Sequence, residues 1–260
     1  MGSGSATRYE VRQAAGWITL DSVETRNALT APLVKELTQH LRRAADDPEV
    51  RVIVLTGTGP AFCAGADLKN RGEMGEPGAR GRHPLVDVLQ LMRNGPKPVI
   101  CAVNGAAFGG GVGLVAAADI AIAAERARFS FSEVRLGLIP AMISVVVLPK
   151  LGEHTTLRLF LTAERFDARQ ALEYGLLHRV VADDELEAAV QEEIDAIAMG
   201  GPIAIREAKQ FVRTVATLTE AEAYRYAEKK IGDLFASEEA AEGMAAFRQK
   251  RSPRWVSDED

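Results

Sequence analysis

The sequence predicts an α/β fold with stacked β-α crossovers up to Pro140 and a mostly helical remainder. Two β-branched runs, at 51–56 and 98–103, are bounded by glycine or proline and are typical of buried strands. Turns and helical patterns separate these runs from the strand patterns that follow them. After Pro140 the pattern changes to successive helices, interrupted by one short strand at 178–181.

The elements of the first part follow one another at short intervals. Residues 16–20 predict a strand, and Thr30 is a candidate N-cap for a helix that runs to about Ala45 with leucines four apart. Four glycines, a proline and five charges at 70–82 predict a mobile loop over a site or a tolerated surface insertion. The other elements expected here are the strand at 51–56, a helix at 83–93, the strand at 98–103, a helix after Gly111 and a strand at 119–123.

The second part is a series of helical patterns with few turn signals between them. The expected helices lie at 145–151, 155–162, 168–174, 184–199, 203–216, 220–237 and 238–250. A helical extension of this kind often packs on neighbouring subunits, so we expect it to contribute to an oligomer.

Composition excludes several classes of protein. The net charge of −5 over 260 residues argues against general nucleic-acid binding. No run of about 18 apolar residues occurs, so we expect no membrane span. The two cysteines, Cys63 and Cys101, match no metal-ligand spacing, and we expect neither a disulfide nor a metal site. A reducing, cytoplasmic location fits this cysteine usage.

Two glycine-rich segments and one carboxylate carry the chemistry. The segments are 61–68, Ala-Phe-Cys-Ala-Gly-Ala-Asp-Leu, and 104–111, Asn-Gly-Ala-Ala-Phe-Gly-Gly-Gly, and Glu133 follows them. Glycine lets backbone N–H groups approach one point, because it has no Cβ. Two such donors on a carbonyl oxygen make an oxyanion hole, and a nearby carboxylate can move the proton. This combination suits an enzyme that acts next to a thioester.

The second glycine segment has rival interpretations. Gly111-x-Gly113-x-x-Ala116 fits a dinucleotide-binding fingerprint, but the preceding strand ends near Val103 and the motif lies in the middle of the chain. A phosphate-binding P-loop requires Lys-Ser/Thr after the glycines, and none is present. The glycines could simply let a helix pack closely on the sheet. The presence of another glycine-rich segment, which also follows a buried strand, favours the oxyanion hole.

Four segments in order, 61–69, 97–111, 127–140 and 161–176, resemble the enoyl-CoA hydratase/isomerase (crotonase) superfamily. The resemblance extends from about Arg8 to Trp255. It implies a spiral of ββα units followed by a helical region that mediates trimerisation. Residues 1–7 would then be a disordered start, 8–195 the crotonase spiral core and 196–260 the C-terminal helical region.

The resemblance also implies roles for individual residues. The N–H groups of Ala66 and Gly110 would form the oxyanion hole, with Gly110 at a helix N-terminus, and Glu133 would be the acid/base group. Because Glu133 stands between apolar neighbours, we expect burial to raise its pKa. His83 is a candidate general acid or substrate partner, or simply a helix-start residue. The expected substrate-binding residues are Arg26, Ala64, Asp67, Leu68, Lys69, His83 and Gly113, with Arg26 and Lys69 as candidate phosphate ligands and Asp67 fixing the turn.

One position departs from the family pattern. Hydratases of this family commonly carry a first glutamate as Gly-Gly-Gly-x-Glu, and this chain has Gly113 there. Hydration, double-bond isomerisation and decarboxylation are all chemically feasible with Glu133 alone. The stretch 135–144 resembles the branch that acts on methylglutaconyl-CoA and related carboxyl-bearing acyl-CoAs.

These observations predict a lyase that hydrates a branched or functionalised 2-enoyl-CoA. Its expected partner is the acyl-CoA thioester, with no nucleic acid or membrane, and it requires no cofactor because coenzyme A is part of the substrate. We expect a homotrimer or hexamer. The alternatives are an isomerase or decarboxylase on the same fold, or a non-catalytic acyl-CoA-binding member.

Overall fold

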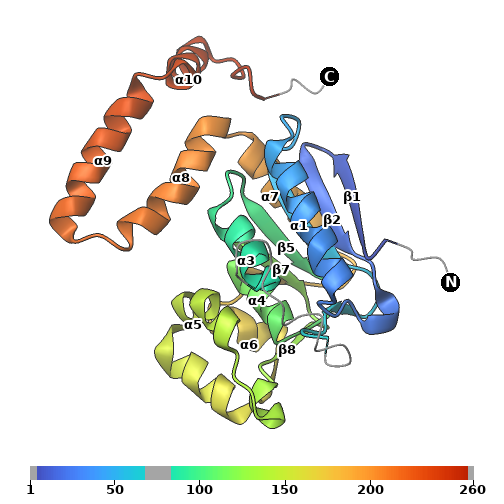
Figure 1. Ribbon diagram of the computed structural model, residues 1–260. Coiled ribbons are helices and arrows are strands. Elements are labelled where there is room, and N and C mark those ends of the chain that lie inside the picture. The colour runs from blue at the N-terminus through green and yellow to red at the C-terminus, as the bar shows by residue number, and fades with distance from the viewer. Residues whose placement is uncertain (1–4, 68–82, 257–260) are drawn as a thin grey trace.

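The computed structural model describes residues 5–67 and 83–256 (Figure 1). Its larger sheet has six strands in the order β1-β2-β3-β5-β7-β10. Within it the β1–β2 hairpin is antiparallel, and the other neighbours pair in parallel. The strands are β1 (Thr7–Arg12), β2 (Ala15–Leu20), β3 (Val52–Gly57), β5 (Val99–Val103), β7 (Ile120–Ala124) and β10 (Arg179–Val181).

A second sheet of four short strands runs in the order β4-β6-β8-β9. Its members follow those of the first sheet along the chain, so that β3-β4, β5-β6 and β7-β8 are each followed by a helix. This repetition is the ββα spiral expected from the sequence, and the α/β fold class is confirmed. The sequence patterns did not predict these three-residue strands: β4 (Ala61–Cys63), β6 (Ala106–Phe108), β8 (Arg128–Ser130) and β9 (Arg165–Asp167).

Helix α1 begins where the sequence predicts its cap. The Thr30 side chain accepts a hydrogen bond from the N–H of Leu33 at the start of α1, which confirms the predicted N-cap. The helices are α1 (Ala31–Asp46), α3 (Pro84–Asn94), α4 (Gly110–Ala117), α5 (Ala141–Thr162), α6 (Ala168–Glu173), α7 (Leu186–Ala198), α8 (Pro202–Val215), α9 (Glu220–Phe235) and α10 (Glu238–Gln249), with 3-10 turns η1 (Val23–Thr25) and η2 (Glu133–Leu136).

Helix α5 differs from the expectation of two separate helices. It begins at Ala141, directly after Pro140, and includes both predicted segments. Gly152 interrupts it with a positive φ of 70°, and Pro149 lies three residues earlier. The break is therefore where the sequence predicted it, but it kinks one continuous element.

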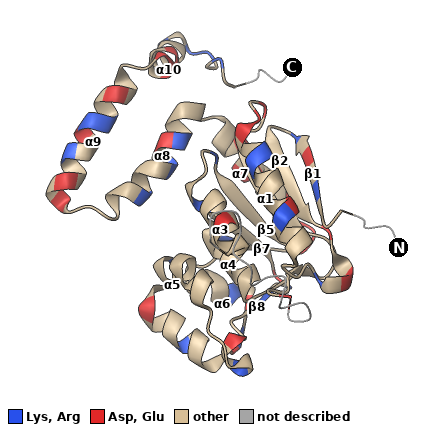
Figure 2. Ribbon diagram, viewed as in Figure 1, with Lys and Arg blue, Asp and Glu red and all other residues tan. Residues whose placement is uncertain are grey.

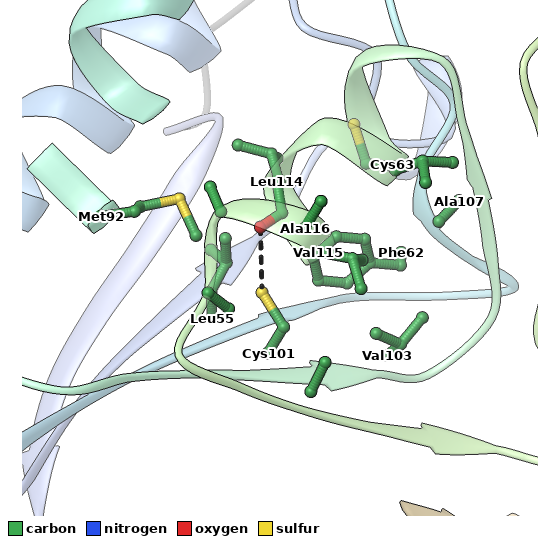
Figure 3. Close-up of a cluster of buried hydrophobic side chains, with 14 of the residues drawn as sticks. Leu55, Phe62, Cys63, Met92, Cys101, Val103, Ala107, Leu114, Val115 and Ala116 are labelled. Atoms are coloured by element: carbon green, nitrogen blue, oxygen red, sulfur yellow. Dashed lines mark hydrogen bonds between the residues drawn. The ribbon is translucent and has the colours of Figure 1, made fainter. Parts of the chain in front are cut away.

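The core between the sheets and α4 is apolar and contains both cysteines (Figure 3). Cys63 and Cys101 are free and fully buried, and the Cys101 thiol points to the Leu114 carbonyl oxygen at 3.7 Å. Burial raises the pKa of Cys63 to about 12 and also raises the pKa of Cys101. Both side chains are thus packing residues without a thiolate at neutral pH.

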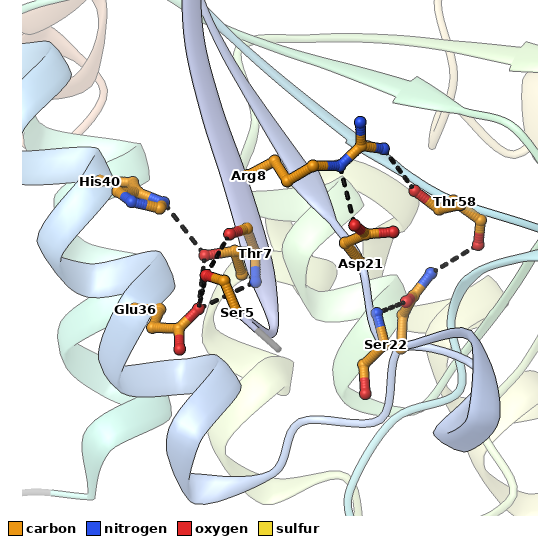
Figure 4. A network of polar contacts seen from close by, with 9 residues as sticks. Ser5, Thr7, Arg8, Asp21, Ser22, Glu36, His40 and Thr58 are labelled. Carbon is orange, nitrogen blue, oxygen red and sulfur yellow. Dashed lines mark hydrogen bonds and ion pairs between the residues drawn. The ribbon is translucent and has the colours of Figure 1, made fainter. Parts of the chain in front are cut away.

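Strand β1 is anchored to α1 by a polar network (Figure 4). The N–H of Thr7 and the hydroxyl of Ser5 donate to Glu36 Oε2, at 2.9 and 2.8 Å. His40 Nδ1 lies 3.0 Å from the Thr7 hydroxyl. Ser5 and Thr7 fall within the start expected to be disordered, and these bonds instead fix them against α1.

The C-terminal helices leave the body of the molecule as an arm (Figure 1). Helix α7 still packs on the large sheet and spans the expected boundary at 195/196, whereas α8 and α9 contain no buried residue. Charged residues lie along both arm helices (Figure 2), and Lys230 joins α9 to Glu207 of α8 at 2.7 Å. In the ranges 5–67 and 83–256, no helix is long and apolar enough to cross a membrane.

Candidate active site

The two glycine-rich segments meet because β4 and β6 are adjacent parallel strands. Ala61 pairs with Ala106 and Cys63 with Ala107, so both segments leave the sheet at the same edge. Gly65 then takes a φ of +88°, and a Cβ there would lie 2.7 Å from the Phe108 carbonyl oxygen. The same Cβ would be 3.5 Å from the Gly110 nitrogen. Only glycine allows this approach of the two donor segments.

A third segment holds the first donor in place. The N–H of Ala64 donates to the Arg26 carbonyl oxygen at 3.0 Å, and the N–H of Leu29 donates to the Gly65 carbonyl oxygen at 2.8 Å. Leu29 and Ala66 form an isolated parallel bridge. The segment from Arg26 to Leu29 thus fixes the backbone on which Ala66 lies.

Asn27 keeps that third segment in its unusual conformation. Arg26 and Asn27 both have positive φ angles, 54° and 56°. The Asn27 side chain is fully buried, accepts from the N–H of Ser22 at 2.8 Å, and donates to the carbonyl oxygens of Thr58 and Ala61 at 3.1 and 2.9 Å. Asparagine tolerates this backbone region better than most residues. Asn27 is therefore a positioning residue that sequence reasoning missed.

The second donor begins helix α4. Gly110 is the first residue of the helix, so its N–H has no acceptor within the helix, and the helix dipole is positive at this end. Gly109 before it donates to the Ser130 carbonyl oxygen at 2.9 Å. The predicted position of Gly110 at a helix N-terminus is confirmed.

Glu133 lies beside this helix end, at the start of η2. Its Oε1 is 2.9 Å from the point that a Cβ on Gly109 would occupy. Its Oε2 is buried and has no hydrogen-bond partner among the described residues. Burial raises the pKa of Glu133, and the hydrogen bond from its own backbone N–H opposes this in part. The carboxylate is thus a stronger base than an exposed glutamate.

One pocket of about 610 Å³ brings these groups together. Of the residues expected in the site, Ala66, Asp67, His83, Gly110 and Glu133 line it. Its apolar wall, which sequence reasoning did not assign, consists of Leu29, Leu85, Leu138, Ile139, Pro140, Ala141, Met142 and Ile143. The oxyanion-hole candidates and the carboxylate therefore face one mostly apolar space.

Three expected substrate-binding residues do not line this pocket. Ala64 and Arg26 lie behind Ala66 and contribute backbone hydrogen bonds, and Gly113 is buried within α4. Leu68 and Lys69, like the expected loop at 70–82, lie outside the described residues.

Gly113 is the position where the family pattern places its first glutamate. A Cβ on Gly113 would lie 2.3 Å from Ile143 Cγ2 and 2.9 Å from Ile143 Cβ. Ile143 thus occupies the space that a side chain from position 113 would need, and it also lines the pocket. The lack of a side chain at Gly113 and the presence of Ile143 beside it therefore go together, because Ile143 and a glutamate at position 113 could not both fit.

His83 caps a helix and also lines the pocket. It is the N-cap of α3, where the N–H of Leu85 donates to its Nδ1 at 3.2 Å, and it also lines the pocket. Its capping position was one of the two alternatives open in the sequence. In the part of the chain that the structure describes, no group of three or more His, Cys, Asp and Glu is placed to hold a metal ion.

Comparison with known proteins agrees with this fold and shows the family. The family model of enoyl-CoA hydratase/isomerase matches residues 10–258, so the chain belongs to this family and is an enzyme of it. Carnitinyl-CoA dehydratase of Proteus mirabilis is 37% identical over 239 residues, which cover 88% of this chain and 90% of the relative. The carnitinyl-CoA dehydratase of Escherichia coli (strain K12) is also 37% identical, over 248 residues that cover 92% and 93%.

Solved structures of the family superpose closely on this chain. An enoyl-CoA hydratase from Shewanella pealeana has a TM-score of 0.90 at 34% identity, with 96% of each chain covered. An enoyl-CoA hydratase from Bacillus anthracis has a TM-score of 0.89 at 32% identity and covers 96% of this chain and 99% of its own.

The role of Asn27 can be tested by substitution. Asn27→Ala leaves one buried N–H and two carbonyl oxygens without their partner, so we expect it to lower the free energy of unfolding by about 3–5 kcal/mol and to reduce kcat. Gln13→Ala is a matched control, because Gln13 also has a positive φ (49°) but is exposed. It should cost less than about 1 kcal/mol in urea unfolding. Equal losses in the two variants would contradict the role of the buried hydrogen bonds.

Proposed function

We propose that this enzyme reversibly hydrates a 2-enoyl-CoA, with Glu133 as the only acid/base group. The carboxylate of Glu133 takes a proton from water while the hydroxide oxygen bonds to C3, and the C2=C3 electron pair moves toward the thioester. The enolate that results takes the proton from Glu133 at C2, so one water is added and Glu133 is ionised again. The reaction involves no net oxidation, and each proton transfer is assigned to Glu133, so the proposed steps use no redox cofactor.

The observation that carries this proposal is the shared pocket of Glu133 with Ala66 and Gly110. Backbone N–H donors at these two residues would stabilise the negative charge that develops on the thioester oxygen. Removing one oxyanion-hole donor in other enzymes costs about 3 kcal/mol of transition-state stabilisation. Helix α4 adds its positive end at the same place.

The arrangement at position 113 favours a one-carboxylate mechanism over the usual pair. With Ile143 against Gly113, α4 contributes no acidic side chain to the pocket. Glu133 alone can still act in both steps. It receives a proton from water in the first step and returns that proton to C2 in the second.

The same arrangement supports double-bond isomerisation as a second candidate. One base that moves a proton between C4 and C2 through the same enolate needs no bound water, and the Ile143 side of the pocket is apolar. The relatives named carnitinyl-CoA dehydratase favour hydration as the first candidate.

The described lining favours an acyl chain that is mostly apolar. Among the described lining residues there is no Lys or Arg to hold a second carboxylate, as in methylglutaconyl-CoA, and no Phe, Tyr or Trp ring to hold the quaternary ammonium of carnitinyl-CoA. The exposed side chains of Leu138, Ile139 and Met142 offer an apolar wall instead. Arg26 and Lys69 stay the predicted ligands of the coenzyme A phosphates.

Product analysis by mass spectrometry tests the reaction. The panel is crotonyl-CoA, a 3-enoyl-CoA, 3-methylglutaconyl-CoA and carnitinyl-CoA, with wild type, Glu133→Gln and the exposed control Glu153→Gln. We expect crotonyl-CoA to gain one water, and Glu133→Gln to lower this rate by about 100- to 10,000-fold while Glu153→Gln leaves it unchanged. A shifted double bond without water would establish the isomerase. Binding of every thioester without any product would contradict both reactions.

We also propose that the arm of α8, α9 and α10 packs on further copies of this chain in a trimer or hexamer. Ile231, Phe235 and Phe247 are all more than half exposed on the arm, which is unusual for large apolar side chains unless they lie in an interface. This agrees with the role of the helical region that the resemblance implies.

The oligomer can be tested by sedimentation. Ile231→Lys with Phe235→Lys should convert the assembly to monomers, because two buried charges would be left without partners. Glu220→Lys at the start of the same helix is the control and should keep the assembly. A wild-type chain that sediments as a monomer would contradict the proposal.

A further inference from the structure

A second pocket lies at the opposite end of α4 from the oxyanion hole. It has a volume of about 350 Å³ and shares no described lining residue with the active-site pocket. Its walls come from the ends of α3 and α4, from α5 and from α8: Arg93, Pro98, Ala116, Ala117, Ala118, Asp119, Pro149, Lys150, Lys209, Val212 and Arg213.

The charge on these walls is unbalanced. Four of the described lining residues are cations, Arg93, Lys150, Lys209 and Arg213, and Asp119 is the one carboxylate among them. An excess of three positive charges thus surrounds a concave space. The carbonyl ends of α3 and α4 each supply about half a negative charge, which leaves an excess of about two.

Asp119 does not pair with all four cations, because both of its carboxylate oxygens already accept hydrogen bonds from other donors. Oδ2 accepts from Lys209 Nζ and from the N–H of Val99, both at 2.8 Å, and Oδ1 accepts from Arg213 Nη2 at 2.5 Å. Lys209, with a side chain only 5% exposed, also donates to the carbonyl oxygens of Met92 and Lys97. Lys209 and Asp119 therefore form a satisfied ion pair that ties α8 to the core.

One of the other donors lacks an acceptor among the described residues. Arg213 Nη1 is buried without a hydrogen-bond partner among the described residues, which is uncommon for a guanidinium nitrogen. Lys150 is half-buried, and desolvation lowers its pKa although Asp119 acts in the opposite direction. Desolvation likewise lowers the pKa of Arg213. Burial thus disfavours the charge of both groups in the unliganded pocket.

From this pocket, its excess charge and the unpartnered guanidinium nitrogen, we infer a binding site for a phosphate group, free or as a phosphomonoester. A phosphate dianion matches the excess of about two charges. The lining offers guanidinium N–H donors from Arg213 and an ammonium from Lys150, and these are groups that proteins commonly use to bind phosphate oxygens. The volume of about 350 Å³ is large enough for the group.

Inorganic phosphate is the probe for this site. Calorimetric titration at constant ionic strength should show saturable binding to wild type, and Arg93→Gln with Lys150→Gln should weaken it at least tenfold. These two residues hold neither Asp119 nor the active site, so the double variant should fold. The exposed Arg42→Gln, which removes a positive charge that does not line the pocket, should bind phosphate as wild type does.

Two further titrations distinguish this pocket from the coenzyme A site and phosphate from a carboxylate. Arg26→Gln should keep the affinity for phosphate. If Arg26→Gln weakens phosphate binding and the Arg93/Lys150 variant does not, phosphate binds at the coenzyme A site and the inference is overturned. Acetate should bind at least tenfold more weakly than phosphate. Equal affinities for acetate and phosphate would indicate a site for a carboxylate and not for a phosphate. An unchanged affinity for phosphate in the Arg93/Lys150 variant would show adventitious binding only.

Discussion

The parallel pairing of β4 with β6 is the constraint on which the rest of the site depends. Each strand has only three residues, yet their register sets two glycine-rich turns beside each other at one edge of the small sheet. The segment around Asn27 holds one turn, and the start of α4 supplies the other. A shift of one residue in this pairing would separate Ala66 from Gly110 and remove the geometry of an oxyanion hole.

Burial then gives Glu133 its chemistry. The carboxylate lies against Gly109 in a mostly apolar pocket, and the loss of hydration raises its pKa. The folded protein consequently holds this proton more tightly than the unfolded chain does, so its stability falls as the pH rises from the ordinary pKa of a glutamate through the raised pKa of Glu133. The loss of stability accompanies a carboxylate whose pKa is closer to neutral pH, which suits a general base.

Helix α4 lies between the active-site pocket and the second pocket. Its N-terminus faces the place where negative charge develops in the proposed reaction, and its C-terminus faces the cations of the second pocket. Both placements follow the direction of the helix dipole. The helix itself carries no charge and is entirely buried, which suits a short element that separates two sites.

Sequence reasoning succeeded where the signal is local. The β-branched runs that became β3 and β5, the Thr30 cap and the glycine turns are each visible within a few residues. The strands of the small sheet are too short for any periodicity, so they were missed. Asn27 and Ile143 were missed for another reason, because their roles depend on contacts with residues 34 and 30 positions away.

The dependence of kcat/KM for hydration on pH tests most directly whether one buried carboxylate does the acid/base work. Glu133 must be ionised in the free enzyme, so the rate should fall as the pH drops through its raised pKa. We expect a single ionisation, with a slope of one in the logarithmic plot and a midpoint above the ordinary value of 4.5. A slope of two, or a midpoint at or below 4.5, would contradict a mechanism that depends on one buried carboxylate.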